Sequence, residues 1–450
     1  MGHLMMSVSG VRGVVGAGLT PDRVVRLASA FGTLVGDGRV VVGRDSRLSG
    51  EMIYAAVVAG LTAAGRDVVR LDVVPTPTVQ LAVEMLGAQG GIAVTASHNP
   101  PEWNALKFVS HHGTFLDRAE AEELFAIERD NRIDWARYDA LGAESAHGGA
   151  IDAHVERILA LSILDRQKVA ARRPKVVVDA LHGAGGPITA RLMDALGCDA
   201  EILYEAPTGR FPREPEPLPQ NIGELCEVVR RNGADVGFAL DPDGDRLALV
   251  DESGTPMGED ATLPMAMHYV LARKKGPVVT NYSTSMLVDD VAERHGCEVR
   301  RAPVGEANVV SRMKEVDAVI GGEGNGGVIL PALHLGRDAP VAMALIASLI
   351  AEQERPISAI LGDFPRYIMR KEKLELTRGA DLEGLEAVAT RFEDASVDRA
   401  DGVYLRWDDG FLHVRKSGTE PIVRIIAESR DEARLAERVN VVRGLIRAGH

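Results

Sequence analysis

A serine ends an apolar run and stands directly before a Pro-Pro turn in the segment TASHNPPEWNALKF, residues 95–108. A serine acts as a nucleophile or carries a phosphoryl group only where a base, a metal or cations stabilise the developing charge. His98 and Lys107 are the local candidates for that task. The segment alone also allows Ser97 to do no more than hydrogen-bond its own turn. It disfavours a Ser-His-Asp hydrolase, because the GxSxG elbow is absent and adjacent side chains seldom adopt triad geometry.

Three aspartates alternate in the loop DPDGDR, residues 241–246, between two apolar runs. Hard oxygen donors on one loop suit Mg²⁺, and three carboxylates at this spacing repel one another unless a cation neutralises them. The loop is not an EF-hand, because Arg246 stands where that motif needs glycine and strands rather than helices flank it. The alternative is a solvated acidic turn. The spacing favours a metal site formed by Asp241, Asp243 and Asp245, with Arg246 beside it to bind a phosphoryl or hydroxyl oxygen.

A glycine-rich segment, GGEGNGGVILP at residues 321–331, places Glu323 and Asn325 on backbone that can approach a ligand closely. A carboxylate near an amide suits the hydroxyl groups of a sugar. Taken alone, the same segment describes a tight turn without function. Its interpretation therefore depends on the motifs around it.

The segment VRKSGTEPIVR, residues 414–424, surrounds a turn with arginines and hydroxyl groups. Guanidinium groups, hydroxyls and backbone N–H groups together form an anion-binding nest that needs no helix dipole. The segment is not a Walker loop, because the GxxxxGK[ST] spacing is absent. The alternative is a surface hairpin flanked by two arginines. The candidate anion-binding residues are Arg415, Ser417, Gly418, Thr419 and Arg424.

Short runs rich in β-branched residues precede several of these loops, and stretches of helical periodicity follow them. This alternation predicts an α/β fold, and runs that are apolar on both faces are typical of parallel sheets. The strands we expect lie at residues 68–74, 91–96, 175–181, 235–240, 277–281 and 318–322. Ligands in open α/β sheets bind beyond the carboxyl ends of the strands, so the polar loops of several sheets can share one cleft.

Length and composition limit the class of protein. With about 150 residues per domain, a chain of 450 residues has about three domains, with one or two either way. The net charge of −14 argues against nucleic-acid binding. The three cysteines are far apart and form no CxxC pair, which disfavours disulfides and fits a reducing cytoplasm. Neither a secretory leader nor an apolar window of about 18 residues is present, so we expect no membrane partner.

Changes in composition predict where the domains meet. A small, polar segment ends at residue 150, a hairpin-like unit around DPDGDR ends near residue 253, and a strand-turn-strand-loop-strand-helix pattern begins at about residue 365. We therefore expect three α/β domains at 1–150, 151–253 and 254–364, and a smaller α+β domain at 365–450.

The four motifs, in this order, closely resemble the fingerprints of the α-D-phosphohexomutase family. These fingerprints are a TASHNP phosphoserine loop, a DGDxDR-like metal loop, a GExSG sugar loop and a C-terminal SGTEP phosphate loop. Shorter echoes are SGVRG at 9–13, GRDSRLSG at 43–50, PTPT at 75–78 and VGEANV at 304–309. The resemblance covers essentially the whole chain. It implies three related α/β domains with mixed sheets flanked by helices, and a smaller fourth domain, arranged around one deep cleft.

The resemblance also implies a role for each motif. Phosphorylated Ser97 would carry the phosphoryl group between O1 and O6 of a hexose, through a hexose 1,6-bisphosphate that also serves as activator. The residues that would bind one Mg²⁺ are Ser97, Asp241, Asp243 and Asp245. The residues that would line the transfer site are Arg12, His98, Lys107 and Arg246. The residues that would orient the sugar are Gly305, Glu323 and Asn325. The residues that would hold the non-reacting phosphate are Arg415, Ser417, Gly418, Thr419 and Arg424.

Departures from the family pattern concern the sugar. Where many relatives have GExSGH, this chain has GEGNGG, so Asn325 replaces serine and Gly327 replaces histidine. NALK stands for NGxK, and KSGTEP for PSGTEP, which adds the charge of Lys416. GEGNGG and SGVRG look most like members named phosphoglucosamine mutase or broad phosphoglucomutase/phosphomannomutase. We favour the first, with hexose phosphates as partners and a monomer or homodimer as the assembly. A phosphatase and a silent sugar-phosphate sensor are the other hypotheses.

Overall fold

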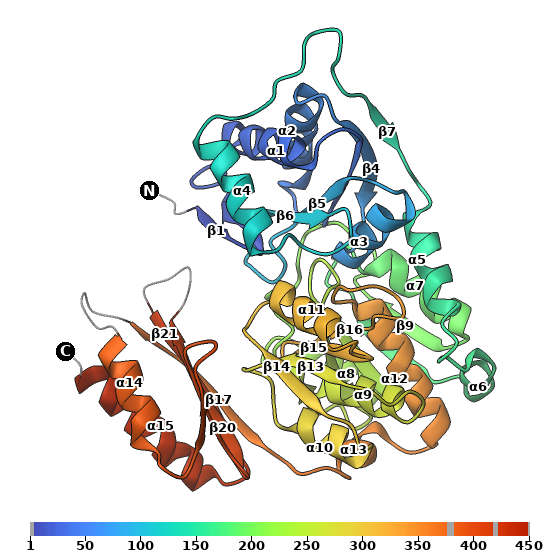
Figure 1. The fold of residues 1–450 in the computed structure, drawn as a ribbon. Helices are drawn as coiled ribbons and strands as arrows, with labels where there is room; N and C mark the ends of the chain where they lie inside the picture. Colours follow the sequence, from blue (N-terminus) through green and yellow to red (C-terminus); the bar gives the residue numbers. More distant parts are fainter. Residues whose placement is uncertain (1–3, 376–381, 417–421, 449–450) are drawn as a thin grey trace.

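The computed structural model describes residues 4–375, 382–416 and 422–448, and the strands within them form four sheets (Figure 1). We name domains I to IV after these sheets, in chain order. Figure 1 shows domain I above the other domains and domain IV at the opposite end of the molecule.

Domain I contains a mixed sheet of order β1-β2-β6-β5-β3-β4-β7, in which β3 runs parallel to β4 and β5. Its strands are β1 (Met5–Ser7), β2 (Gly10–Val14), β3 (Arg39–Arg44), β4 (Asp67–Val73), β5 (Gly90–Val94), β6 (Trp103–Ser110) and β7 (Glu144–Ala146). Its helices are α1 (Pro21–Val35), α2 (Gly50–Ala63), α3 (Thr76–Met85) and α4 (Arg118–Arg129). Val40 and Val42 belong to the core under α1, α2 and α4, whereas Val41 belongs to the core under α3. Side chains of β3 alternate between the two faces of the sheet, and helices cover both faces, so β3 is buried on both sides.

Domain II contains a sheet of order β12-β11-β10-β8-β9. Its strands are β8 (Lys175–Asp179), β9 (Asp199–Leu203), β10 (Val236–Leu240), β11 (Leu247–Asp251) and β12 (Pro256–Gly258). Its helices are α5 (Ala150–Leu159), α6 (Arg166–Arg172), α7 (Gly186–Leu196) and α8 (Gly223–Asn232). Strand β10 runs parallel to β8 and turns back as an antiparallel hairpin into β11. The DPDGDR loop is the turn of this hairpin.

Domain III contains a sheet of order β14-β13-β15-β16. Its strands are β13 (Val278–Asn281), β14 (Val299–Ala302), β15 (Ile320–Glu323) and β16 (Gly327–Ile329). Its helices are the 3₁₀ turn η1 (Glu259–Ala261), α9 (Thr262–Leu271), α10 (Leu287–Arg294), α11 (Glu306–Glu315), α12 (Ala339–Gln353) and α13 (Ile357–Leu361). Domains II and III share one continuous apolar core, in which Phe238 of β10 and Leu345 of α12 belong to the same cluster. This shared core fixes the metal-loop hairpin relative to the sugar loop.

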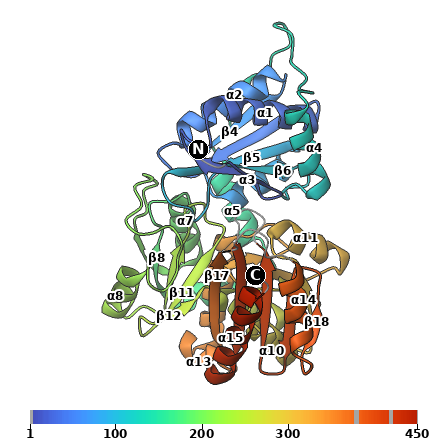
Figure 2. The same cartoon turned by 90° about the vertical axis from the view of Figure 1, so that its left-hand side faces the viewer.

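Domain IV contains an antiparallel sheet of order β17-β21-β20-β19-β18. Its strands are β17 (Ile368–Glu375), β18 (Ser396–Asp398), β19 (Val403–Trp407), β20 (Gly410–Lys416) and β21 (Ile422–Ser429). Its helices are α14 (Leu382–Arg391) and α15 (Glu432–Ala448). Both helices lie on one face of the sheet (Figure 2), and Leu435 and Val439 of α15 are buried there. On the other face, Tyr404 and Phe411 pack against Tyr282 of domain III.

The predicted α/β class with four domains is confirmed. The six strands expected from the sequence are present as β4, β5, β8, β10, β13 and β15. The phosphoserine, metal and sugar loops follow β5, β10 and β15, each of which has a parallel neighbour, so all three loops lie at carboxyl strand ends. In the described part of the chain, no helix is both long and apolar enough to cross a membrane.

Candidate active site

The loop that carries Ser97 has a strained and rigid backbone. Ser97 has φ +48°, a left-handed conformation that is uncommon for a residue other than glycine. Its N–H donates to Thr95 Oγ1 at 2.9 Å. The buried Arg47 side chain donates through Nη2 to the carbonyl oxygens of Ser97 at 2.5 Å and Asn99 at 2.6 Å. Asp45 holds the other edge of this guanidinium at 3.0 Å, so the loop rests on a fixed ion pair.

The hydroxyl of Ser97 points across the boundary between domains I and II. Ser97 Oγ donates to Asp241 Oδ2 at 2.6 Å, and His98 Nδ1 lies 3.4 Å from Ser97 Oγ. The shortest hydrogen bond of the Ser97 side chain is therefore to the metal loop, 144 positions away in the sequence. The structure brings together the two motifs that sequence spacing alone could not connect.

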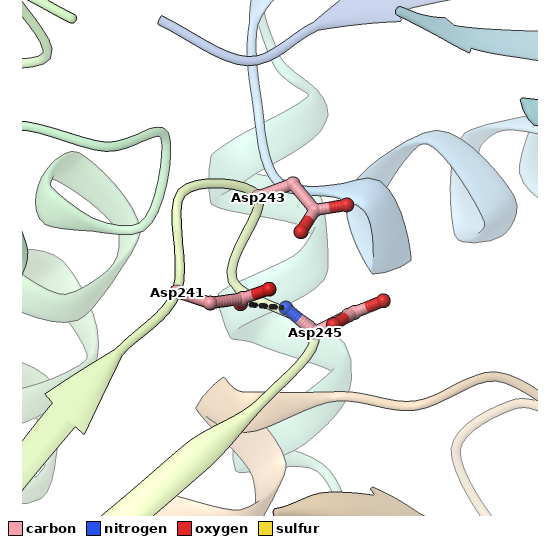
Figure 3. Close-up of side chains that lie close together, drawn as sticks. All are labelled: Asp241, Asp243 and Asp245. Carbon is pink, nitrogen blue, oxygen red and sulfur yellow. Dashed lines mark hydrogen bonds between the residues drawn. The ribbon is translucent and has the colours of Figure 1, made fainter. Parts of the chain in front are cut away.

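The three aspartates of the metal loop converge (Figure 3). Each offers a carboxylate oxygen, and these oxygens lie within 4.8 Å of one another. All three residues are buried, and among the described residues Asp243 Oδ1 and Asp245 Oδ1 have no hydrogen-bond partner. Burial, and next the charges of Asp243 and Asp245, raise the pKa of Asp241 well above its usual value. Buried, unsatisfied carboxylate oxygens that repel one another are a donor set that fits a divalent cation.

Lys107 provides a positive charge in direct contact with this cluster. Its Nζ donates to Asp243 Oδ2 at 2.7 Å and to Asp245 Oδ2 at 3.3 Å. Burial by itself would lower the pKa of Lys107, but the two aspartates raise it above its usual value. The side chain is therefore an ammonium group at neutral pH.

Arginines from several domains face the same space. Burial, and then the charges of Arg246, Arg337 and Arg424, lower the pKa of Arg12. The buried Nε of Arg246 has no hydrogen-bond partner among the described residues. Repulsion from Arg246, followed by burial, lowers the pKa of His98 well below 6.5, so its imidazole is neutral at pH 7. Positive charge gathered around Arg12 in this way suits a polyanion.

The sugar loop presents Glu323 at the end of β15. Glu323 Oε1 accepts from Asn281 Nδ2 at 2.7 Å and from the N–H of Gly305 at 3.1 Å. Its Oε2 accepts from Arg337 Nη1 at 2.9 Å. Asn325 turns its Oδ1 toward the N–H of Gly327 in its own loop, at 3.3 Å. Glu323 and Gly305 are thus in direct contact, whereas Asn325 bonds within its own loop.

The domain IV motif lies partly outside the described residues: Ser417, Gly418 and Thr419 are not among them. Arg415 and Arg424 are directly opposite each other on β20 and β21, and Arg415 Nε also donates to Asp401 Oδ1 at 3.2 Å. Two guanidinium groups on neighbouring strands can bind one anion together. The pair is consistent with an anion-binding edge of the sheet.

Arg47 and Arg337 are among the residues of the site that were not singled out from the sequence. Arg47 belongs to the echo GRDSRLSG, which could have directed attention to it, although nothing there indicates that it supports Ser97. Arg337 lies in the segment LGRDAP and had no sequence signal, yet it binds both Asp245 and Glu323.

Comparison with known proteins places this geometry in one family. The model of phosphoglucomutase/phosphomannomutase alpha/beta/alpha domain I matches residues 4–132, domain II residues 152–254, domain III residues 258–367, and the C-terminal domain residues 372–445. The chain belongs to the phosphoglucomutase/phosphomannomutase family. The family predicted from the four motifs, and with it an enzyme of the phosphohexose mutase class, is confirmed.

Members of this family resemble the chain along its full length. A protein of Methanopyrus kandleri named probable phosphoglucosamine mutase is 38% identical over 433 residues, covering 95% of this chain and 94% of the relative. A phosphoglucomutase/phosphomannomutase of Thermococcus kodakarensis is 38% identical over 440 residues, covering 95% of each chain. The crystal structure of a phosphoglucomutase/phosphomannomutase family protein from Burkholderia thailandensis has a TM-score of 0.85 at 30% identity, covering 99% of this chain and 98% of that one.

Proposed function

We propose that this protein interconverts the 1-phosphate and 6-phosphate of a hexose through phosphorylated Ser97 and a hexose 1,6-bisphosphate. The observation that carries the proposal is the 2.6 Å contact between Ser97 Oγ and Asp241 Oδ2 inside a buried cluster of three carboxylates. This contact places a hydroxyl on a strained loop next to a cation-binding donor set, which is what a phosphoryl carrier needs.

Ser97 Oγ and one oxygen each of Asp241, Asp243 and Asp245 would hold one Mg²⁺. Asp243 Oδ1 and Asp245 Oδ1, which accept no hydrogen bond from the described residues, support this assignment. When bound, Mg²⁺ supplies positive charge that stabilises the transferring phosphoryl group.

In the transfer step, the bond from phosphorus to Ser97 Oγ breaks while a bond forms from phosphorus to the free hydroxyl of the hexose monophosphate. Lys107, Arg12 and Arg246 stabilise the equatorial oxygens by charge. The proton of the sugar hydroxyl passes to neutral His98, and the same Nδ1 can return it to Ser97 Oγ, 3.4 Å away. The product of this step is a hexose 1,6-bisphosphate bound to unphosphorylated Ser97.

The second half of the reaction requires the bisphosphate to turn around, so that its other phosphate faces Ser97. We propose that Arg415 and Arg424, with Ser417, Gly418 and Thr419, hold whichever phosphate is not reacting. The same phosphate-binding site then serves both orientations of the bisphosphate. Free hexose 1,6-bisphosphate would act as activator by phosphorylating Ser97, and enclosure between domains would exclude water from the phosphoserine.

For the sugar, we propose glucosamine phosphate, with a broad phosphoglucomutase/phosphomannomutase as the alternative. Glu323 would accept a sugar hydroxyl, beside Gly305 and Asn325. Relatives with both names are equally similar to the chain, at 38% identity, and the GEGNGG loop departs from the commoner pattern. We keep as part of this proposal a cytoplasmic monomer or homodimer with domain borders near residues 150, 253 and 364.

The experiment is ³¹P NMR of the purified protein with Mg²⁺ and a trace of hexose 1,6-bisphosphate. Glucosamine, glucose and mannose 6-phosphates are supplied in parallel. Conversion to 1-phosphates that Ser97→Ala abolishes supports the mutase and ranks the sugars. Ser348→Ala, which removes a buried hydroxyl from α12 far from the site, is the matched control and should retain activity. Release of inorganic phosphate would favour a phosphatase, and no turnover would favour a sugar-phosphate sensor.

A further inference from the structure

Strand β16 begins with Gly327, and an arginine side chain fills the space where a side chain at this position would lie. Gly327 is the cross-strand partner of Glu323, so a side chain at position 327 would stand beside the Glu323 carboxylate. A Cβ added to Gly327 would lie 2.2 Å from Cδ and 2.8 Å from Cγ of Arg337. The Arg337 side chain thus passes over Gly327, through the space that the histidine of the GExSGH pattern would need.

Arg337 ends between three carboxylates that come from different elements. Its Nη2 donates to Asp245 Oδ2 at 2.7 Å, its Nη1 to Glu323 Oε2 at 2.9 Å, and its Nε to Glu306 Oε2 at 2.8 Å. All four side chains are buried. A planar guanidinium with a fixed fork of donors sets the relative positions of its partners, which a flexible ammonium does not. Arg337 therefore joins the metal loop to the sugar loop through one rigid group.

The backbone of Arg337 is itself held firmly. Arg337 pairs with Ile329 in an isolated bridge beside β16, and the next residue, Asp338, donates its N–H to the Val328 carbonyl at 2.9 Å. The carboxylate of Asp338 accepts from His154 Nε2 at 2.8 Å and lies 3.0 Å from His334 Nε2, in a fully buried cluster. Both ends of the Arg337 side chain are thus anchored, so the guanidinium has one position to adopt.

We propose that Arg337 is a positioning and specificity-determining residue for the hexose, and that Gly327 is required because it admits the arginine. Arg337 fixes the Glu323 carboxylate at a set distance from the metal loop, and so selects how the sugar ring is oriented while leaving recognition of the phosphate to domain IV. This inference rests on the proposed function and deepens it by naming the residue that couples sugar recognition to the transfer site.

The test measures binding rather than turnover, in a Ser97→Ala background with Mg²⁺. Calorimetry compares two probes, glucosamine 6-phosphate and inorganic phosphate, for the chain with and without Arg337→Met. Arg337→Met removes the charged hydrogen bonds that position Glu323. We expect it to weaken the binding of glucosamine 6-phosphate by about tenfold or more. Inorganic phosphate, which we propose is bound by domain IV, is expected to bind as before. The matched control is Arg66→Met, which removes a buried arginine bonded to Asp37 and the Gly32 carbonyl in domain I.

A second variant tests the role of Gly327. Gly327→Ala adds one Cβ, displaces Arg337 and should reproduce the effect of Arg337→Met. Gly327→Ala and Arg337→Met combined should lower the affinity for glucosamine 6-phosphate no more than either change alone, because both act through the Arg337 side chain. Gly223→Ala is the control, since a Cβ there meets no atom within 4 Å.

Unchanged hexose-phosphate affinity in Arg337→Met would overturn the inference. An equal loss of affinity for both probes would also overturn the inference. A merely structural role, like that of Arg66, does not distinguish a sugar phosphate from inorganic phosphate. The proposed function has its own criterion, interconversion by the protein with Ser97 intact. A chain that binds hexose phosphates through Arg337 but does not interconvert them would refute the mutase and keep the inference.

Discussion

Arg47 Nη2 lies 2.5 Å from the carbonyl oxygen of Ser97, and the guanidinium also donates through Nη1 to the carbonyl oxygens of Pro100 and Trp103. One fully buried side chain thus supports the whole loop that presents the Ser97 hydroxyl. Because Ser97 has a positive φ, the loop depends on such support to keep its conformation.

We expect Arg47→Lys to lower kcat by about 100-fold, because a displacement of the reacting group by about 1 Å has that effect. KM for the hexose phosphate should change little, since the hydrogen bonds of Arg47 to described residues all lie within domain I. Steady-state kinetics with both constants resolved is the measurement. Arg438→Lys, at another buried arginine, which is paired with Asp409 in domain IV, is the control. A rise in KM at constant kcat would contradict a positioning role for Arg47.

The cluster of aspartates predicts a strict dependence on divalent metal. Asp243→Asn removes one charge from the donor set and should weaken Mn²⁺ binding, measured by electron paramagnetic resonance, by at least the roughly 10- to 100-fold that loss of an outer-shell partner costs. Treatment with a chelator should abolish activity, and Mg²⁺ should restore it. Asp251→Asn, at the other end of the same hairpin, should bind Mn²⁺ like the unaltered protein. Equal Mn²⁺ affinity in Asp243→Asn would exclude this loop as the metal site.

The opposed arginines of domain IV predict stabilisation by anions. Inorganic phosphate that binds to Arg415 and Arg424 stabilises the folded state. It should therefore raise the melting temperature of the unaltered protein, and raise that of Arg415→Gln less. KM for hexose phosphates should rise by roughly 10- to 100-fold in this variant, which is the expected loss for a charged hydrogen bond. Arg434→Gln, on the exposed face of α15, is the control. An undiminished effect of phosphate on Arg415→Gln would place the anion elsewhere.

The strands and helices could be predicted from the sequence because the residue patterns that indicate them are continuous along the chain. The run DVGFAL, the loop DPDGDR and the run LALVD follow one another without interruption, so the β10–β11 hairpin and its three aspartates could be predicted together. The same holds for Leu435 and Val439, whose helical spacing marks the buried face of α15.

The supporting contacts of the site could not be predicted in this way. Arg47 reaches Ser97 from 50 positions away, and Arg337 reaches Asp245 across 92. A single arginine has no periodicity, and its partner is set by how the sheets pack. The contact of Arg337 with Glu323 further depends on an absent side chain, that of Gly327, whose significance becomes visible only when the two strands are paired.

The contact between domains III and IV predicts a pH-dependent stability. Glu428 of β21 is buried and accepts from the Met286 N–H at 2.7 Å, and burial is the main cause that raises its pKa from 4.5 to about 7. Between these two values the folded state binds a proton that the unfolded state does not, so the free energy of unfolding falls as pH rises and levels off above about 7.

Glu428→Gln removes this proton uptake while keeping an acceptor for Met286. Its melting temperature, followed by calorimetry from pH 5 to pH 8, should therefore rise relative to that of the unaltered protein as the pH increases. Glu432→Gln, an exposed carboxylate at the start of α15, should follow the unaltered protein throughout. Parallel curves for Glu428→Gln and the unaltered protein would mean that the carboxyl is ionised in the folded state already at pH 5. Contacts between domains III and IV such as the Met286–Glu428 hydrogen bond and the packing of Tyr282 would then stabilise the protein without any contribution from proton binding.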